Sequence, residues 1–444
     1  MSPLFSIRYG AYKNSGEGWL GEVPSHWHVV RLKSLFREKK HRSNMALPCG
    51  AISFGEVVHK NDEMIPELTK KSYQEVLSGE FLVNPLNLNY DLASLRIALS
   101  EIDVVVSAGY IILQASALID RKYFKYLLHC YDVAYMKLLG SGVRQTISFG
   151  HISSSLLLCP PLEEQSAISR FLGIKCAQID QAIQIKERQI ELLKERKQLL
   201  IQQAVTQGLD PRAPMRYSGV DWIGDIPAHW VIKKIRYLGT TQNGISAGAE
   251  FFGHGHPFVS YGDVYHNEEL PEFVSGLANA SAADRNQYSI ARGDVLFTRT
   301  SETAEEIGLA STCFKTITNA TFAGFLIRFR PKINILFEGY SKYYFNAPML
   351  RAYFVKEMSI VTRASLSQQL LKNMPVLLPP AEEQREIYDF LESETAKFKM
   401  AIEIQIQQIG TLKEYKSTLI NSAVTGKIKV PEIVESPMQN MELA

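Results

Sequence analysis

The feature that most constrains the fold is a long helical segment that the chain contains twice. The first copy begins at Pro160-Pro161-Leu162-Glu163-Glu164-Gln165 and ends at Ala204-Val205-Thr206. The second copy lies 219 residues later at both ends, from Pro379-Pro380-Ala381-Glu382-Glu383-Gln384 to Ala423-Val424-Thr425. In each copy a double proline ends the preceding strand, and the acidic residues suit the positive end of a helix dipole. The unchanged spacing indicates that the length of this helix matters.

Both copies carry apolar residues in a heptad pattern of alternating three- and four-residue steps. This spacing is typical of a coiled-coil seam, which a lone helix cannot bury. We therefore predict that the two helices pair with each other. The seam residues are Leu172, Ile179, Ile183, Lys186, Ile190, Leu193, Leu200, Leu391, Phe398, Ile402, Gln405, Ile409, Leu412 and Leu419. Lys186 and Gln405, at the centre, either fix the register of the pair or extend to solvent; the sequence leaves both interpretations open.

A shorter motif with two tryptophans is also duplicated, as WLGEVPSHW at residues 19–27 and WIGDIPAHW at residues 222–230. The segments that follow, residues 28–159 and 231–378, are rich in predicted strands, and each includes one helix, near 122–139 and 339–356 respectively. Their sequences differ from each other, although each ends in a strand that leads into a double proline. The chain thus has a nearly copied frame and two diverged inserts.

The order of these parts is circular, because joining the C-terminus to the N-terminus would complete the second repeat. For the chain to close in space, the two helices must run antiparallel. We expect a mixed α/β (α+β) fold with a pseudo-twofold circular repeat. Its predicted parts are an N-terminal recognition domain (1–159), a central spacer helix (160–208), a C-terminal recognition domain (209–378), a C-terminal spacer helix (379–430) and a disordered tail (431–444).

Composition limits the functional classes that fit this chain. Its 444 residues are too many for one ordinary domain, and its formal net charge is only +2. Any nucleic-acid binding must therefore come from local basic patches. The five cysteines are scattered without a CxxC pair, and the first twelve residues have no signal-peptide core. We expect a soluble, cytoplasmic protein.

The duplicated motifs resemble those of the specificity (S) subunits of Type I restriction-modification systems. The resemblance is carried by the paired tryptophan motifs, by PPLEEQ and PPAEEQ, and by helices ending in AVTQG and AVTGK, and it covers almost the whole chain. It implies a non-catalytic, DNA-binding subunit whose two domains each read one half of a bipartite double-stranded target, with the helices as spacer. It also implies two methyltransferase (modification) subunits bound to the frame, and restriction subunits that translocate and cleave DNA. S-adenosylmethionine, ATP and Mg²⁺ are then expected on the partners and not on this chain.

Candidate DNA contacts are basic or polar residues in or beside predicted turns. Arginine and lysine bind phosphates, whereas arginine, asparagine and glutamine also read base edges. The candidates are Lys70, Lys71, Asn84, Asn87, Arg96, Arg144, Gln145, Arg292, Thr298, Arg299, Thr300, Arg328 and Arg363. Arg144 and Arg363 belong to the copied frame, so contacts with backbone or a partner fit them better than base reading.

The alternative to a recognition subunit is a nuclease or methyltransferase with its own active site. The chain has no GxxxxGK[ST] loop for ATP. Asn84-Pro85-Leu86-Asn87 only faintly resembles the Asn-Pro-Pro-aromatic element of adenine methyltransferases. His254, His256 and His266 with Asn267 have no acidic cluster beside them, and the neighbouring glycines and proline favour a loop over a metal site. We therefore expect no catalytic, cofactor-binding or metal residues in this chain.

Overall fold

The computed structural model describes residues 8–86, 95–136, 147–301, 307–357 and 364–431. The chain divides into two compact units. Unit 1 contains residues 1–185 and 407–444, and unit 2 contains residues 186–406. The long helices α5 (Leu162–Gln207) and α12 (Ala381–Val424) each contribute one half to each unit.

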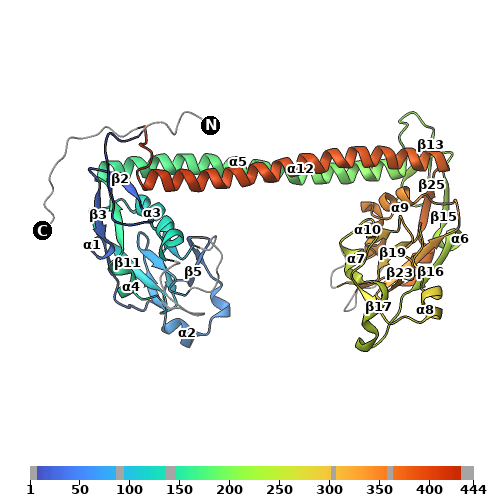
Figure 1. Cartoon of the computed structure of the whole chain (residues 1–444), viewed down its shortest axis with the longest axis horizontal. Helices are drawn as coiled ribbons and strands as arrows, with labels where there is room; N and C mark the ends of the chain where they lie inside the picture. The colour runs from blue at the N-terminus through green and yellow to red at the C-terminus, as the bar shows by residue number, and fades with distance from the viewer. Residues whose placement is uncertain (1–7, 87–94, 137–146, 302–306, 358–363, 432–444) are drawn as a thin grey trace. The chain divides into compact units, whose positions relative to one another are not determined.

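The prediction of a mixed fold with two paired long helices is confirmed (Figure 1). The helices run antiparallel, because a residue later in α5 contacts a residue earlier in α12. Within unit 1, Lys416 Nζ binds the Asp180 carboxylate at 2.7 Å. Within unit 2, Lys186 Nζ donates to Gln405 Oε1 at 3.1 Å. Lys186 and Gln405 are equivalent positions of the repeat, so they meet at the centre of the seam.

Unit 1 is built on a four-stranded antiparallel sheet of order β4-β11-β8-β9, beside the antiparallel pair β3–β12. Helix α3 packs on β9, and its buried side includes Tyr123, Phe124 and Tyr131. The elements before α5 are β1 (Tyr12–Asn14), β2 (Glu22–Pro24), β3 (His28–Arg31), α1 (Leu32–Leu35), β4 (Phe36–Glu38), β5 (Gly50–Ser53), β6 (Glu56–His59), α2 (Glu67–Lys71), β7 (Gln74–Val76), β8 (Phe81–Val83), β9 (Ile97–Leu99), β10 (Val104–Val106), β11 (Ile111–Ala115), α3 (Arg121–Ala134), α4 (Phe149–Ser153) and β12 (Leu156–Cys159).

Unit 2 repeats this plan with the sheet β16-β23-β19-β21 and the pair β15–β25, and it adds a smaller sheet β18-β17-β22. Its elements between the long helices are β13 (Met215–Tyr217), β14 (Asp225–Pro227), β15 (Val231–Lys234), α6 (Ile235–Leu238), β16 (Gly239–Asn243), β17 (Phe252–Val259), α7 (Tyr261–Tyr265), β18 (Leu277–Ala278), α8 (Ala282–Gln287), β19 (Val295–Thr298), β20 (Thr300–Ser301), β21 (Ala310–Thr312), β22 (Thr321–Phe322), β23 (Leu326–Pro331), α9 (Glu338–Tyr344), α10 (Pro348–Glu357), β24 (Ala364–Ser365), α11 (Gln368–Asn373) and β25 (Pro375–Leu378).

Two predicted helices need correction. The single helix expected near 339–356 is two helices, α9 and α10. Pro348 begins α10, where proline is favoured because its missing N–H would have no helical partner. The helix expected near 122–139 is α3, which ends at Ala134; residues 137–139 lie outside the described residues.

The tryptophan motifs tie each recognition domain to the helices. Trp27 and Trp230 are fully buried. In unit 1 the ring of Trp19 packs on Tyr131 of α3, with centroids 5.8 Å apart. In unit 2 the ring of Trp222 packs on Tyr353 of α10 at 5.2 Å. These large aromatic faces hold an irregular segment in place, as the duplicated motif predicted.

Candidate functional site

Glu164, the second of the two glutamates that open α5, forms a joint with the tryptophan motif of unit 1. The buried Glu164 carboxylate accepts hydrogen bonds from Trp27 Nε1 at 3.0 Å and Tyr9 Oη at 3.1 Å, and it contacts His26 Nε2 at 2.7 Å. The Tyr9 ring lies edge-on to Trp27, with centroids 5.6 Å apart. A buried carboxylate with three partners at a helix N-terminus fixes the angle at which α5 leaves the domain.

Unit 2 contains the same joint without the aromatic ring that Tyr9 supplies in unit 1. Glu383 accepts from Trp230 Nε1 at 3.0 Å and contacts His229 Nε2 at 2.8 Å. The strand pairing makes Arg212 the counterpart of Tyr9, and the Arg212 side chain is 92% exposed. No aromatic ring therefore covers Glu383 from this position.

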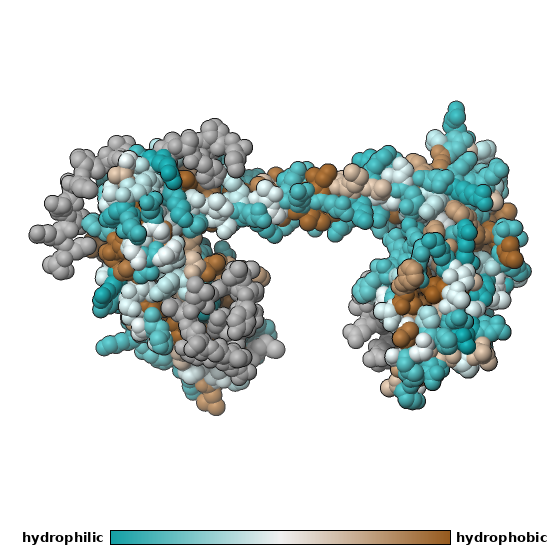
Figure 2. All heavy atoms as spheres, viewed as in Figure 1, coloured by the Kyte–Doolittle hydropathy of each residue, from teal (hydrophilic) through white to brown (hydrophobic). Residues whose placement is uncertain are grey.

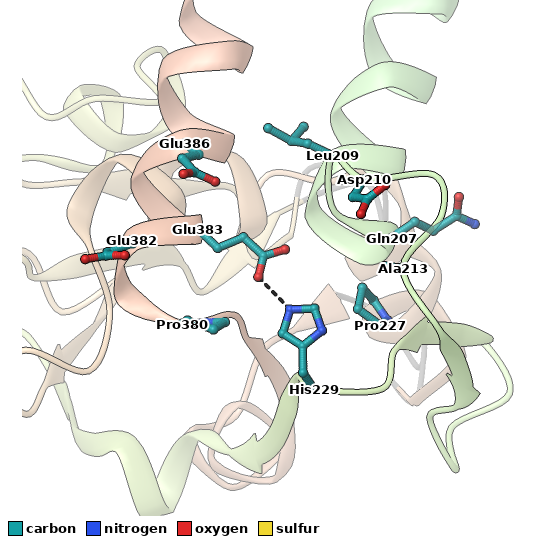
Figure 3. Close-up of a pocket in the computed structure, with 10 residues that line it drawn as sticks. All are labelled: Gln207, Leu209, Asp210, Ala213, Pro227, His229, Pro380, Glu382, Glu383 and Glu386. Atoms are coloured by element: carbon teal, nitrogen blue, oxygen red, sulfur yellow. Dashed lines mark hydrogen bonds and ion pairs between the residues drawn. The ribbon is translucent and has the colours of Figure 1, made fainter.

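A hollow of about 520 Å³ opens beside the joint of unit 2 (Figure 3). Its lining residues come from the end of α5 and the loop that follows it, from the tryptophan motif, and from the start of α12 with the proline before it: Gln207, Leu209, Asp210, Ala213, Pro227, His229, Pro380, Glu382, Glu383 and Glu386. At the joint of unit 1, by contrast, Tyr9 is buried, as are Ile428 and Val430 after α12. The two joints thus share a framework and differ in how completely it is filled.

The glutamine of each PPxEEQ motif connects the helix to the recognition domain. Gln165 Nε2 donates to the Pro160 carbonyl at 2.7 Å, and its Oε1 accepts from the backbone N–H of Asp120, the N-cap of α3, at 2.8 Å. In unit 2, Gln384 donates to the Pro379 carbonyl at 3.0 Å and accepts from the Phe337 N–H at 2.8 Å. The Phe337 residue precedes α9, so both glutamines hold the start of a recognition-domain helix.

The other end of each long helix is held by a buried tyrosine. In unit 1, Tyr123 Oη donates to the Val424 carbonyl at 3.0 Å. In unit 2, Tyr340 Oη lies 3.4 Å from the Val205 carbonyl near the end of α5, and it donates to the Leu377 carbonyl of β25 at 3.1 Å. Burial raises the pKa of both phenols well above their usual value.

A glycine follows each helix and packs on the tryptophan motif. Gly208 and Gly426 adopt φ of +73° and +71°, which suits glycine at a helix C-terminus. A Cβ on Gly426 would lie 2.4 Å from Pro24 and 3.0 Å from Trp27. The end of α12 therefore reaches the N-terminal tryptophan motif within unit 1, as the circular order of the sequence predicted.

None of the predicted seam positions is exposed. Leu172, Ile179, Ile183, Leu391, Ile409 and Leu419 are buried, and Lys186, Ile190, Leu193, Leu200, Phe398, Ile402, Gln405 and Leu412 are half-buried. The hydrogen bond between Lys186 and Gln405 favours the register-fixing interpretation of these two polar residues.

The candidate DNA contacts of unit 1 differ from one another in burial and in their bonding partners. Lys70 is paired with Asp62 at 2.7 Å, whereas Lys71 is exposed and 3.9 Å from Glu67. Asn84 is half-buried, and its Oδ1 accepts from the Leu86 N–H. Arg96 is buried, and its Nε donates to Asp132 at 3.0 Å. This core ion pair argues against Arg96 as a DNA contact. Asn87, Arg144 and Gln145 lie outside the described residues.

In unit 2, two candidates lie in the interior. Thr298 is fully buried, and its Oγ1 accepts from the Leu309 N–H at 2.9 Å. Arg328 is buried and donates to Gln242 and to the Ser289 carbonyl. Desolvation by burial lowers the pKa of Arg328 to about 10. Both positions favour a structural role.

The other described candidates of unit 2 are exposed or half-buried. Arg292 is 66% exposed and pairs with Glu338. Arg299 and Thr300 are half-buried where β19 ends and β20 begins. Arg363 lies outside the described residues. The described candidates that are not buried are Lys70, Lys71, Asn84, Arg292, Arg299 and Thr300.

Sequence reasoning did not identify Glu164 and Glu383 as the centres of the joints. The signal was present, because both glutamates and both His-Trp pairs occur in duplicated motifs. Within the described residues, no cluster of three histidine, cysteine, aspartate or glutamate side chains could hold a metal ion, and the histidines at 254, 256 and 266 form none. A search of the described helices finds none that is both long and apolar enough to cross a membrane.

Comparisons with known proteins match this arrangement. Residues 240–408 match the family model "Type I restriction modification DNA specificity domain". The chain is 26% identical to the EcoKI specificity subunit of Escherichia coli K12 over 63% of this chain and 59% of that protein. It is 23% identical to the MjaVIII specificity subunit of Methanocaldococcus jannaschii over 93% of this chain and 95% of that protein.

Solved structures show the same fold. A protein from a study of assembly and conformational transition of the type I R-M system aligns with a TM-score of 0.67 at 17% identity, covering 91% of this chain and 99% of its own. The HsdS subunit of Thermoanaerobacter tengcongensis aligns with a TM-score of 0.51 at 17% identity, covering 91% and 98%. In its duplicated motifs, its paired helices and its fold, the chain is similar to the specificity subunits of Type I restriction-modification systems.

Proposed function

We propose that this chain is the DNA-recognition subunit of a Type I restriction-modification complex, in which each recognition domain reads one half of a bipartite double-stranded target. The observation that carries the proposal is the contrast between frame and insert. Both units share the joint, the four-strand order and the tyrosine at the helix end. They differ in the elements outside that frame, such as the β5–β6 hairpin in unit 1 and the β18-β17-β22 sheet in unit 2. One frame with two different surfaces suits a protein that reads two different sequences.

The proposal includes the domain boundaries expected from the sequence, with recognition domains at 1–159 and 209–378 and spacer helices at 160–208 and 379–430. It assigns S-adenosylmethionine, ATP and Mg²⁺ to partner subunits. The names of the relatives, which are specificity subunits, support recognition without catalysis. The competing function is a nuclease or methyltransferase with its own active site.

A binding experiment separates these functions. The purified chain, with and without its methyltransferase subunit, is titrated with duplex DNA in the presence of Mg²⁺, ATP and S-adenosylmethionine. We expect sequence-preferring binding by the pair and no cleavage or methylation by the chain alone. Cleavage or methylation by the chain alone would overturn the proposal. If the chain with its methyltransferase subunit showed no sequence preference for DNA, the chain would act as a scaffold and not as a recognition subunit.

We further propose that exposed apolar residues on the long helices bind methyltransferase subunits, one on each unit. In unit 2, Leu192 and Leu199 lie one heptad apart on α5 and are 48% and 60% exposed. On α12, Met400 and Ile404 lie one turn apart and are 63% and 49% exposed. In unit 1, Ile174 and Ile185 lie about three turns apart on α5 and are each 52% exposed. Hydrophobic surface is visible along the helices in Figure 2. Grouped exposed apolar residues mark interaction sites.

The stoichiometry of the complex tests this docking proposal. Native mass measurement should find two methyltransferase subunits for each specificity chain. The pair Leu192→Lys and Leu199→Lys should remove one copy, and Ile174→Lys with Ile185→Lys should remove the other. Since these residues are about half exposed, the substitutions should leave the fold intact, which circular dichroism checks. A single methyltransferase subunit at saturation in the unaltered complex, or two retained by both variants, would contradict the proposal.

A further inference from the structure

The β5–β6 hairpin of unit 1 ends in an unusual turn. Ser53 pairs with Glu56, so the loop contains only Phe54 and Gly55. Both residues have positive φ, +48° and +78°, which is the geometry of a type I′ turn. Asparagine, aspartate or glycine normally occupies the first position, because an L-residue with a bulky side chain is strained there. The choice of phenylalanine therefore opposes the local backbone preference.

Packing within the domain does not account for this residue either. The Phe54 side chain is 89% exposed. The cross-strand pair Ile52 and Val57 of the same hairpin behaves differently, since it packs against the cluster formed by Val76, Leu82, Val104, Val106 and Ile112. A strained, solvent-exposed aromatic residue points to a function outside the domain.

The tip that carries Phe54 is held firmly. Gly55 lies so close to the domain that an added Cβ would be 2.7 Å from Leu95 Cδ1 and 3.3 Å from His129 Cε1. At the other end of the hairpin, Cys49 forms a bridge with Val105, and the Lys60 N–H donates to the Cys49 carbonyl at 2.8 Å. The phenyl ring is thus an apolar projection on a rigid support.

The surroundings of the tip fit a polyanion. On α3, Lys122, Lys125 and His129 lie at i, i+3 and i+7, so they share one face of the helix. The last of them, His129, lies against Gly55. Lys125 lies close enough to His129 to contribute to its lowered pKa, although burial is the larger cause. Two lysines on the helix face that ends at the hairpin tip are placed to bind phosphates beside an inserted ring.

We propose that Phe54 inserts between neighbouring base pairs of the half-site bound by the N-terminal recognition domain. Apolar wedges unstack a base step and bend the duplex, and an aromatic ring can stack on the exposed bases. This inference rests on the proposed DNA-recognition function. It assigns a positioning contact to a residue that the sequence did not identify.

The decisive variant is Phe54→Asn, because it separates a binding role from a structural one. Asparagine suits the type I′ turn, so the variant should unfold at a higher temperature than the parent chain. If the ring stacks on bases, the same variant should bind DNA about 10- to 100-fold more weakly. A merely structural residue would not give these opposite changes. Phe54→Gly serves as a second turn-compatible variant, and Leu118→Asn, at a 67% exposed leucine, is the matched control.

The assay uses the complex of this chain with its methyltransferase subunit and a 30-base-pair duplex carrying the two methylated half-sites found by methylome sequencing. A 2-aminopurine placed at successive steps of each half-site should brighten at one step on binding. Phe54→Asn should abolish that signal, whereas Leu118→Asn should keep it.

Unchanged affinity and fluorescence in Phe54→Asn and Phe54→Gly would overturn the wedge while leaving DNA recognition intact. Loss of the methyltransferase subunit from these variants, with DNA affinity otherwise kept, would instead make Phe54 a protein contact and would also overturn it. Absence of DNA binding by the unaltered complex would refute the proposed function itself.

Discussion

The two joints allow a comparison of equivalent glutamates within one chain. Glu164→Ala removes the acceptor for two buried donors, Trp27 Nε1 and Tyr9 Oη. Glu383→Ala removes it for one buried donor, Trp230 Nε1. The remaining partner of Glu383, His229, is 48% exposed and can bond to water.

Each buried donor left without a partner costs about 1–3 kcal/mol. The variant Glu164→Ala should therefore destabilise its joint by about 4 kcal/mol, and Glu383→Ala by about 2 kcal/mol. At about 1.4 kcal/mol for each factor of ten, local opening should rise on the order of 1,000-fold and 30-fold. The two effects are unequal because Tyr9 donates a hydrogen bond to Glu164, whereas the equivalent position of unit 2 is Arg212, which is not aromatic.

Hydrogen exchange resolved by peptide measures each joint in the intact chain, because exchange reports local opening. The peptides cover residues 20–31 with 162–172 for unit 1, and 223–234 with 381–391 for unit 2. The exposed neighbours Glu163 and Glu382 provide matched controls. Replacing them with alanine removes only a charge near the helix dipole, worth about 0.3–1 kcal/mol. Equal acceleration by both joint variants, or a larger effect of Glu383→Ala, would refute this reasoning.

Two further predictions concern the spacer helices and acid stability. Inserting one heptad beside Arg188 and one beside Gln407 preserves the seam and lengthens each helix by about 10 Å, or ~3 base pairs of DNA. Methylome sequencing should then find the same half-sites with a gap ~3 base pairs longer; affinity should fall because the grooves are rotated, and an active variant with the original gap would show that the helices do not set the spacing. Asp62 pairs with Lys70 and accepts from the Cys49 N–H, and these bonds, the Lys70 bond first, lower its pKa to about 2. A lowered carboxylate pKa stabilises the fold above the ordinary value near 4 and ceases to do so as pH falls to about 2. Hydrogen exchange of the Cys49 amide, corrected for its intrinsic rate, should therefore accelerate as the pH falls from about 4 to about 2. The variant Asp62→Asn should remove this pH dependence of the corrected exchange rate.

The frame could be predicted from the sequence because its signals are local and repeated. A heptad pattern shows which helix face is buried, and a second copy of the same pattern supplies the partner. The joint residues were visible in the same duplicated motifs, although their roles became clear only from the contacts of Glu164 and Glu383.

The surfaces proposed to read DNA were harder to predict, because burial depends on partners distant in the chain. Arg96 pairs with Asp132, 36 residues away, and Arg328 donates to Gln242, 86 residues away. Neither sequence neighbourhood distinguishes these arginines from exposed Arg292. Phe54 was missed for a related reason, since a phenylalanine in a strand-rich segment is usually a core residue.

The central claim is that each recognition domain reads one half of the target. It is tested most directly by replacing residues 231–372 with the corresponding insert of a relative whose target is known, and sequencing the methylome of a host that carries the hybrid. We expect one half-site to change to that of the relative while the other half-site stays the same. A change in both half-sites, or in neither, would contradict it.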